Sequence, residues 1–217
     1  MTSGELLDGH TLSVEATGTR TEAGEGRNTF SAKVTDADGA DVTANYAFLE
    51  DLGTLKVTPV EISVSSGSAE KVYDGTPLTC DGYTVSSATK LLEGHTVTEV
   101  VMPSSQTDAG VTSNTITQLV ICDEDGRDVS NNYNVRYFYG TLLVRPMPIT
   151  VRSGSASKVY DGTPLTCNGE DDWEFTSIYR PIEGHTAQVA ISGTRTEVGE
   201  SDNTIAQVLI YDEAEKD

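Results

Sequence analysis

Histidine is the side chain most often used as a general base or metal ligand near neutral pH, and the three histidines of this chain share one setting. His10, His95 and His185 each follow a glycine, in the segments LLDGHT, LLEGHT and PIEGHT. No serine, cysteine or second histidine accompanies them at the spacing that a catalytic triad needs. We therefore predict that each histidine makes a turn-to-strand hydrogen bond after its glycine, and that none is catalytic or binds a metal.

Two acidic segments carry three closely spaced aspartates each: Asp36, Asp38 and Asp41 in the first, and Asp123, Asp125 and Asp128 in the second. Carboxylates in this arrangement suit Ca²⁺, but the glutamate that completes an EF-hand loop is missing from both. Asp-Gly hairpin turns are the favoured interpretation, with calcium as the alternative, and no cofactor is expected.

The three cysteines, Cys80, Cys122 and Cys167, are an odd number and cannot all pair within one chain. Cys80 with Cys122 is the only pair worth considering, because Cys80 and Cys167 occupy the same place in successive repeats. No CxxC or Cys/His cluster with zinc spacing exists. We predict three part-buried free thiols.

The elements that must position these residues form a repeat. The decapeptide KVYDGTPLTC occupies 71–80 and again 158–167, 87 positions later. Other segments recur at the same period, which is the size of one small domain: DGADVTANY with DGRDVSNNY and GTLKVTP with GTLLVRP. TGTRTEAGEGRNTF returns as SGTRTEVGESDNTI about two periods later. Prolines after the alternating segments mark joints, since proline cannot donate to a β-ladder. We predict the later part of one module at 1–59, a complete module at 60–146 and the earlier part of a third at 147–217.

Period-2 alternation of apolar residues dominates the complete module, for example in 61–65, 96–100, 116–121 and 135–139. Asp74-Gly75, Ala109-Gly110 and Asp125-Gly126 punctuate these segments as turns. No helical stripe of 12 residues is present. The expected fold is all-β or mostly-β, with about seven short strands per module and one helical turn near 130–133.

The 34 acidic residues outnumber the 14 Lys and Arg residues, giving a net charge of −20. Such a field repels phosphate backbones and anionic headgroups, so nucleic-acid and membrane-surface binding are not expected. No apolar run approaches the length of a membrane span, and no signal peptide or membrane insertion is predicted.

The ordered set of KVYDGTPLT, EGHT, TxxG…NTI, DGxDVSxNY and YxYGTLLV resembles the YDG and MBG-type repeats of bacterial surface proteins. This resemblance covers nearly the whole chain and implies tandem β-grasp-like or immunoglobulin-like modules on an extracellular, cell-attached protein. It implies a stalk or adhesin role and localisation at the bacterial cell surface.

The repeated decapeptide has a local backbone reason for each residue: Asp-Gly turns the chain and proline stiffens the next segment. A structural corner is therefore favoured. The alternative is a ligand-contacting loop, since tyrosine is enriched at binding surfaces; the ligand-binding candidates are Tyr73, Asp74, Tyr160, Asp161, Tyr137 and Tyr139.

Lysine and asparagine in the same module suggest one covalent possibility. Some surface β-modules of Gram-positive bacteria join a lysine amine to an asparagine side chain beside a buried carboxylate. The candidates are Lys71 with Asn114 and Lys158 with Asn203. A solvated lysine and a turn-closing asparagine are favoured over this isopeptide bond, because lysine is ordinarily exposed.

The expected function is that of a repeat segment binding a host glycoprotein, mucin or other extracellular ligand through loops and strand edges. Alternatives are superantigen-like binding of host immunoglobulin and a passive stalk. A surface-polymer hydrolase ranks last, because the carboxylates fall in turns that recur by module, and we expect no enzyme.

Overall fold

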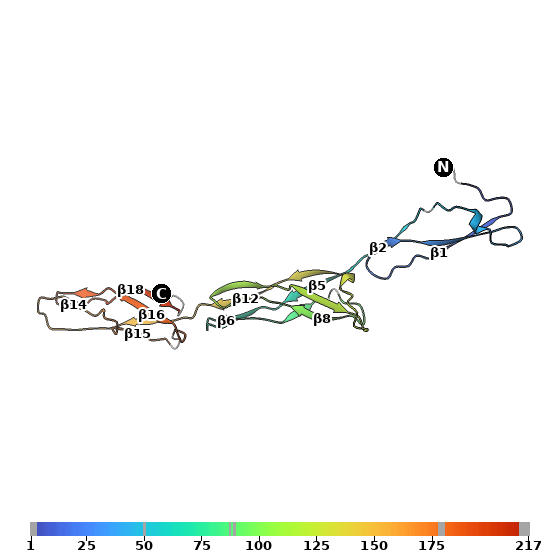
Figure 1. The fold of residues 1–217 in the computed structure, drawn as a ribbon. Coiled ribbons are helices and arrows are strands. Elements are labelled where there is room, and N and C mark those ends of the chain that lie inside the picture. The colour runs from blue at the N-terminus through green and yellow to red at the C-terminus, as the bar shows by residue number, and fades with distance from the viewer. Residues whose placement is uncertain (1–3, 50, 87, 89, 178–180, 213–217) are drawn as a thin grey trace. The chain divides into compact units, whose positions relative to one another are not determined.

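A computed structural model describes residues 4–49, 51–86, 88, 90–177 and 181–212 (Figure 1). The chain is mostly β, as predicted, and the two helical elements in the described ranges are three-residue 3₁₀ turns. Contacts group it into two compact units. Unit 1 comprises 1–67, 81–103 and 115–140, and unit 2 comprises 68–80, 104–114 and 141–217.

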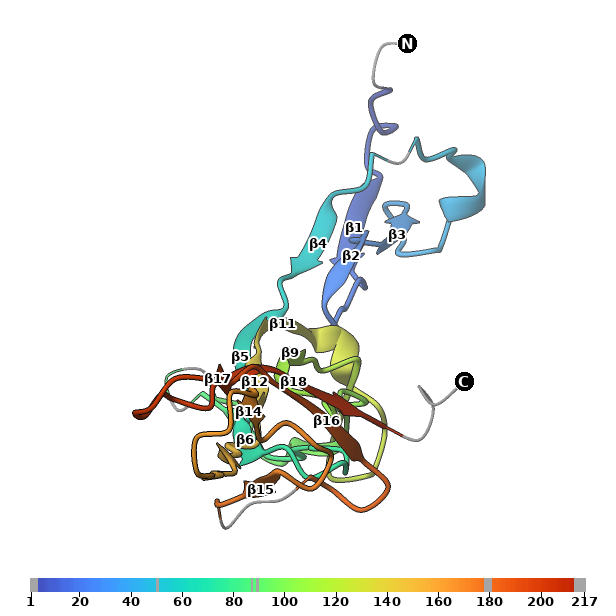
Figure 2. The same ribbon diagram turned by 90° about the vertical axis from the view of Figure 1, so that its left-hand side faces the viewer.

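The N-terminal part of unit 1 consists of two antiparallel strand pairs (Figure 2). Strand β1 (Thr11–Ala16) pairs with β3 (Phe30–Thr35), and β2 (Gly24–Arg27) pairs with β4 (Thr54–Val57). The 3₁₀ turn η1 (Thr43–Asn45) lies between β3 and β4 in the chain.

The rest of unit 1 contains a central three-stranded sheet and a strand pair. In the sheet, β5 (Val60–Ser66) lies between β11 (Tyr133–Phe138), which is parallel to it, and β7 (Tyr83–Val85), which is antiparallel. Strand β8 (Thr96–Val101) pairs with β10 (Gln118–Cys122), and η2 spans Ser130–Asn132.

The core of unit 1 is formed by side chains that alternate inward from these strands. Its buried members are Ile62, Val64, Ile116, Ile121, Val129 and Tyr133. Burying a side chain of this size contributes about 1.5–3 kcal/mol, so this cluster stabilises the unit and fixes the register of β5 against its neighbours.

Unit 2 contains a second three-stranded sheet, in the order β6-β12-β9. Strand β12 (Gly140–Arg145) belongs to this unit from Thr141 onward and lies between β6 (Ala69–Val72) and β9 (Gly110–Asn114). Its Leu142 and Val144 are fully buried.

The C-terminal part of unit 2 is built from three antiparallel pairs: β13 (Val151–Ser153) with β15 (Trp173–Phe175), β14 (Leu165–Thr166) with β17 (Thr194–Arg195), and β16 (Thr186–Ile191) with β18 (Ile205–Tyr211).

Within 60–146 the described residues form eight strands, one more than predicted. The alternating segments 61–65 and 96–100 are β5 and β8, and the expected helical turn is η2. Gly75 and Gly126 adopt φ of 79° and 78°, the left-handed conformation that their predicted turns require.

Candidate functional site

The repeated decapeptide folds into a corner closed by its own lysine. The Lys71 ammonium donates to Asp74 Oδ1 at 2.5 Å and to the carbonyl and hydroxyl oxygens of Thr76 at 2.5 and 2.6 Å. Asp74 Oδ1 also accepts from the Thr76 amide and hydroxyl. Only 19% of the Lys71 side chain is exposed, contrary to the solvated lysine that was expected.

The second copy repeats this geometry in unit 2. Lys158 Nζ donates to Asp161 Oδ1 at 2.8 Å and to the Thr163 carbonyl and hydroxyl at 2.7 and 2.6 Å. Thr163 in turn donates its amide and hydroxyl hydrogens to Asp161 Oδ1. The same ten residues thus form the same closed corner twice, with the lysine, aspartate and threonine bonded to one another.

The corner lowers the pKa of its aspartate. The hydrogen bond from Lys71 is the largest cause for Asp74, followed by those from Thr76, and together they lower its pKa from 3.8 to about 2. Asp161 shifts in the same direction through Lys158 and Thr163. Both carboxylates are therefore charged near neutral pH and serve as acceptors within the turn, which does not suit a general acid.

The tyrosines of the two corners differ in their surroundings. Tyr73 is half-buried and lines a cavity of about 300 Å³ in unit 2, where its ring lies 6.1 Å from that of His185. The side chain of Ile182 packs over Gly75, and its nearest atom lies 3.4 Å from the position that a Cβ on Gly75 would take. Tyr160 is 58% exposed. The lining of the cavity is largely apolar, so its Tyr73–His185 contact is one of ring packing.

The histidines pair with tyrosines that the sequence analysis did not identify as partners. His10 Nδ1 lies 2.8 Å from the Tyr46 hydroxyl, and His95 Nδ1 lies 2.7 Å from the Tyr133 hydroxyl. The Tyr133 hydroxyl also accepts the amide of Leu92 at 3.1 Å. The recurring DVTANY and DVSNNY segments end in these tyrosines. Their recurrence together with the histidine segments is the sequence signal that could have identified the tyrosines as partners. Tyr133 is the first residue of β11, so the His95 bond is a turn-to-strand hydrogen bond as predicted, whereas Tyr46 follows η1 and lies outside the strands.

The proposed isopeptide partners are engaged with different groups. The fully buried Asn114 donates from Nδ2 to the Cys80 carbonyl at 2.8 Å, and Asn203 donates likewise to the Cys167 carbonyl at 2.7 Å. Lys71 and Lys158 are bound within their corners. The asparagines thus hydrogen-bond the end of each decapeptide. The isopeptide bond remains the untested alternative, which an intact-mass measurement decides because each bond would remove one ammonia.

Tyr137 and Tyr139 lie together in unit 1. Their rings are stacked with an interplanar angle of 10° and a centroid distance of 6.3 Å. Burial, followed by the nearby Tyr139, raises the pKa of Tyr137. Tyr139 is 48% exposed and the intervening Phe138 is 52% exposed, so this segment presents aromatic surface at the end of edge strand β11.

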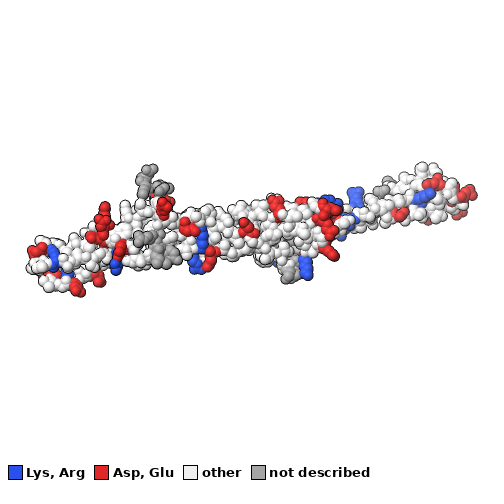
Figure 3. Space-filling view, turned by 90° about the horizontal axis from the view of Figure 1, so that it is seen from below, with Lys and Arg blue, Asp and Glu red and all other residues white. Residues whose placement is uncertain are grey.

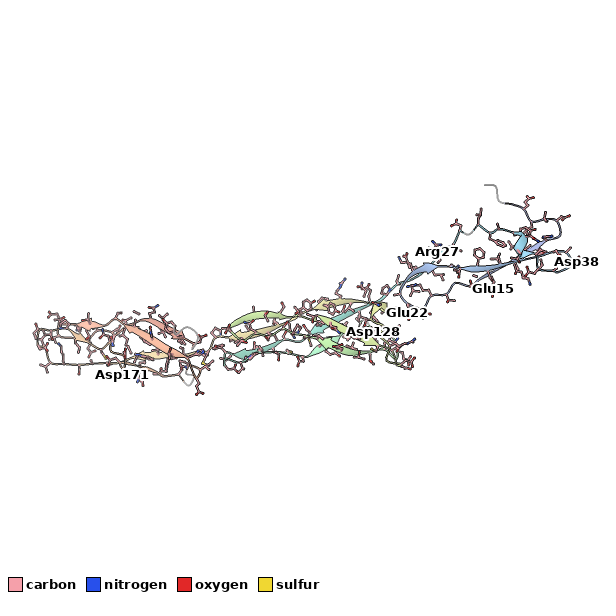
Figure 4. All side chains as sticks on the ribbon, viewed as in Figure 1. Glu15, Glu22, Arg27, Asp38, Asp128 and Asp171 are labelled. Carbon is pink, nitrogen blue, oxygen red and sulfur yellow. The ribbon has the colours of Figure 1, made fainter. Side chains whose placement is uncertain are left out.

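The acidic segments are hydrogen-bonded turns. Asp36 Oδ1 accepts from the amides of Asp38 and Ala40, and Asp123 Oδ1 accepts from those of Asp125 and Arg127. Asp38 lies in the turn after β3 (Figure 4). Among the residues that the structure describes, no three or more His, Cys, Asp or Glu side chains form a group that could hold a metal ion.

All three cysteines are unpaired and half-buried, as predicted, so the considered Cys80–Cys122 bond is not formed. Burial raises the pKa of the Cys167 thiol, and Asp172 adds to this effect. A raised pKa keeps the thiol protonated and poorly nucleophilic at neutral pH.

No family model, no curated protein and no solved structure matches this chain. Among the described helices, none has the length and apolar character needed to cross a bilayer. The candidate function therefore depends on the geometry given above and on the motif resemblance.

Proposed function

We propose that this chain is a structural repeat segment of a bacterial surface protein, whose β-modules serve as spacers. The observation that carries the proposal is the pair of identical closed corners. In each corner the lysine, aspartate and threonine satisfy one another. Each of these residues therefore has a structural reason to be repeated, because each closes part of the turn.

Several further contacts favour a structural role over an enzymatic one. Two histidines are held by tyrosine hydroxyls, and the two asparagines brace backbone carbonyls. A hydrolase needs a nucleophile or paired carboxylates that converge in a cleft. The acidic side chains are instead spread over the visible face (Figure 3), and a net charge of −20 favours solubility of closely spaced copies. Assignment to the bacterial surface rests on the resemblance.

Adhesion to a host glycoprotein is the second candidate, and the stacked Tyr137–Tyr139 pair favours it. Tyrosine and phenylalanine are enriched in protein interfaces. With Phe138, the pair offers aromatic surface next to the open edge of β11. An extended partner can add to such an edge.

A binding array of mucosal glycoproteins, mucins and immunoglobulins, probed with the whole chain, distinguishes the two candidates. The spacer role predicts no saturable binding. Adhesion predicts saturable binding that Tyr139→Ala reduces at least tenfold and that Tyr83→Ala leaves unchanged. Tyr83 is a suitable control because it is a part-exposed tyrosine on β7, at the opposite edge of the same sheet. Saturable binding that ignores both substitutions would contradict both candidates as stated.

A further inference from the structure

Two ladders of unit 1 follow one another across a proline joint. Strand β4 ends at Val57 and β5 begins at Val60, so only Thr58 and Pro59 separate the β2–β4 ladder from the β5–β11 ladder. Proline has no amide hydrogen to donate, and the linker therefore adds no ladder bond at this residue. Any further restraint on the joint has to come from side chains beside it.

One asparagine side chain bridges the joint. Asn132 is the last residue of η2, directly before β11, and Ala23 comes directly before β2. Asn132 Oδ1 accepts the Ala23 amide at 2.7 Å, and Asn132 Nδ2 donates to Glu22 Oε2. Glu22 is labelled at this end of the N-terminal part in Figure 4. The oxygen and the nitrogen of one side chain are thus both bound to two adjacent residues of the other module.

The loop that carries Glu22 and Ala23 is held in shape by its own module. The Arg20 guanidinium donates to the Ala23 carbonyl at 2.7 Å. It also lies over Gly24, whose φ is 125° and where a Cβ would collide with Arg20. The loop therefore presents its carboxylate and amide already ordered, and ordering before contact lowers the entropy lost in binding.

The same loop occurs in all three modules. It is RTEAG at 20–24, QTDAG at 106–110 and RTEVG at 195–199. Gln106 and Arg195 donate to carbonyls within their loops at 2.8 and 3.1 Å, as Arg20 does, and each loop ends in a glycine with positive φ. The asparagine recurs as well, because VTANY and VSNNY both place it before the tyrosine.

Charge acts in the same direction at the joint. Arg127 lies in the turn that precedes η2, and the hydrogen bond and charge of Asp123 are the largest causes that raise the pKa of its guanidinium. The charges of Asp125 and Glu22 add to this effect. Arg127 thus attracts the same Glu22 carboxylate that Asn132 binds.

We propose that this contact, the Asn132 clamp, is the surface by which one module recognises the module before it. The asparagine that ends the DVxxNY turn binds the acid and the following amide of the TExG-type loop in the preceding module. With the proline linker, the clamp gives the joint two points of attachment and makes the two ladders reorient as one body. It acts whether the modules serve as spacers or as adhesive domains, so it does not depend on the proposed function.

Amide exchange measured by NMR on the whole chain tests the clamp at its acceptor. Asn132→Ala should accelerate exchange of the Ala23 amide about tenfold, since one hydrogen bond is lost. Asn45→Ala is the matched control, because Asn45 occupies the same place in η1. It should leave the exchange rate of Ala23 within about twofold.

A donor–acceptor exchange separates the clamp from local damage to η2. Asn132→Asp brings a second carboxylate to Glu22, so it should accelerate exchange at Ala23 as Asn132→Ala does. Adding Glu22→Gln restores a complementary pair, because the glutamine amide can donate to the aspartate. The double variant should therefore return Ala23 exchange toward the original rate, which a simple disturbance of η2 would not allow.

Residual dipolar couplings in a weakly aligned sample measure the joint itself. A single alignment tensor should fit the amides of β2 and β4 together with those of β5 and β11. Asn132→Ala should require two tensors, with weaker alignment of the β2–β4 ladder, and Asn45→Ala should still require one.

Three results would overturn the proposal. These are unchanged Ala23 exchange in Asn132→Ala, equal acceleration in Asn45→Ala, and separate tensors already in the unmodified chain. If Asn132→Ala fails to fold, Glu22→Ala tests the clamp from the exposed side of the joint. It should also require two tensors, and a single tensor in that variant would contradict the clamp.

Discussion

Lysine is usually among the most exposed residues, yet Lys71 is four-fifths covered because three oxygens receive its ammonium hydrogens. The positive φ of Gly75 turns the chain so that Asp74 and Thr76 reach the same amine. The identity of the two decapeptides is explained at this scale, because the lysine, aspartate, glycine and threonine each close part of the corner.

Asn114→Ala tests the brace behind the first corner. The substitution leaves the Cys80 carbonyl without its donor in a buried setting, so the free energy of unfolding should fall by about 1–3 kcal/mol. Urea denaturation followed by circular dichroism measures it. Asn134→Ala removes an exposed bond to Glu61 and should cost less than about 0.5 kcal/mol; equal losses would show that the Asn114 brace is dispensable.

At the scale of elements, the sequence predicted strands best where apolar residues alternate along one buried face. β5 and β11 meet this condition, and the SNN turn before Tyr133 was predicted as helical. In β8 the core-packing Val97 and Val100 are three residues apart, because the register with β10 shifts between them. The segment 116–121 was only partly correct, because Ile116 is buried outside a strand and β10 begins at Gln118. Alternation fixes which face is buried and does not fix where the ladder begins.

The sequence did not predict which strands pair with one another. The parallel pairing of β11 with β5 joins segments about 73 residues apart, for example Asn134 with Glu61, and local patterns carry no record of such pairings. The His95–Tyr133 bond depends on the same long-range arrangement. The sequence analysis also predicted solvated side chains for the lysines at 71 and 158. This prediction was wrong because the hydrogen bonds of each lysine follow from the geometry of its turn, which residue propensities do not describe.

Leu142→Ala tests the importance of β12 as the central strand of its sheet. Leu142 is fully buried, and removing such a side chain leaves a cavity that costs about 2–5 kcal/mol. Amide exchange in the sheet should accelerate accordingly. Val111→Ala on β9 is the matched control, because Val111 is 65% exposed and should change stability by less than about 0.5 kcal/mol. Equal acceleration would contradict the assigned core.

For the whole molecule, the dominant quantity is the net charge of −20. Repulsion among these charges opposes folding and is screened by salt, whose Debye length falls from about 30 Å at 0.01 M to about 3 Å at 1 M. Raising NaCl from 10 to 500 mM at pH 7 should therefore raise Tm by several degrees.

The control for this experiment is the same comparison near the sequence pI of 4.3, where net repulsion vanishes and the rise in Tm should shrink. A similar rise at both pH values would attribute the effect to general salt stabilisation and not to charge repulsion.

The central claim is that each decapeptide forms the same corner, closed by hydrogen bonds from its own lysine. NMR titration of the Asp74 and Asp161 carboxyl carbons in the whole chain tests this claim most directly. In the folded chain the pKa of the aspartate lies below the ordinary 3.8. The hydrogen bonds between lysine and aspartate in each corner therefore contribute stability that is present above pH 3.8 and is lost as the pH falls toward the folded pKa. Asp74 should titrate at about pH 2 and Asp161 also well below 3.8, and Lys71→Met should raise the pKa of Asp74 alone. A midpoint near 3.8 for either carboxyl in the unmodified chain would contradict the account.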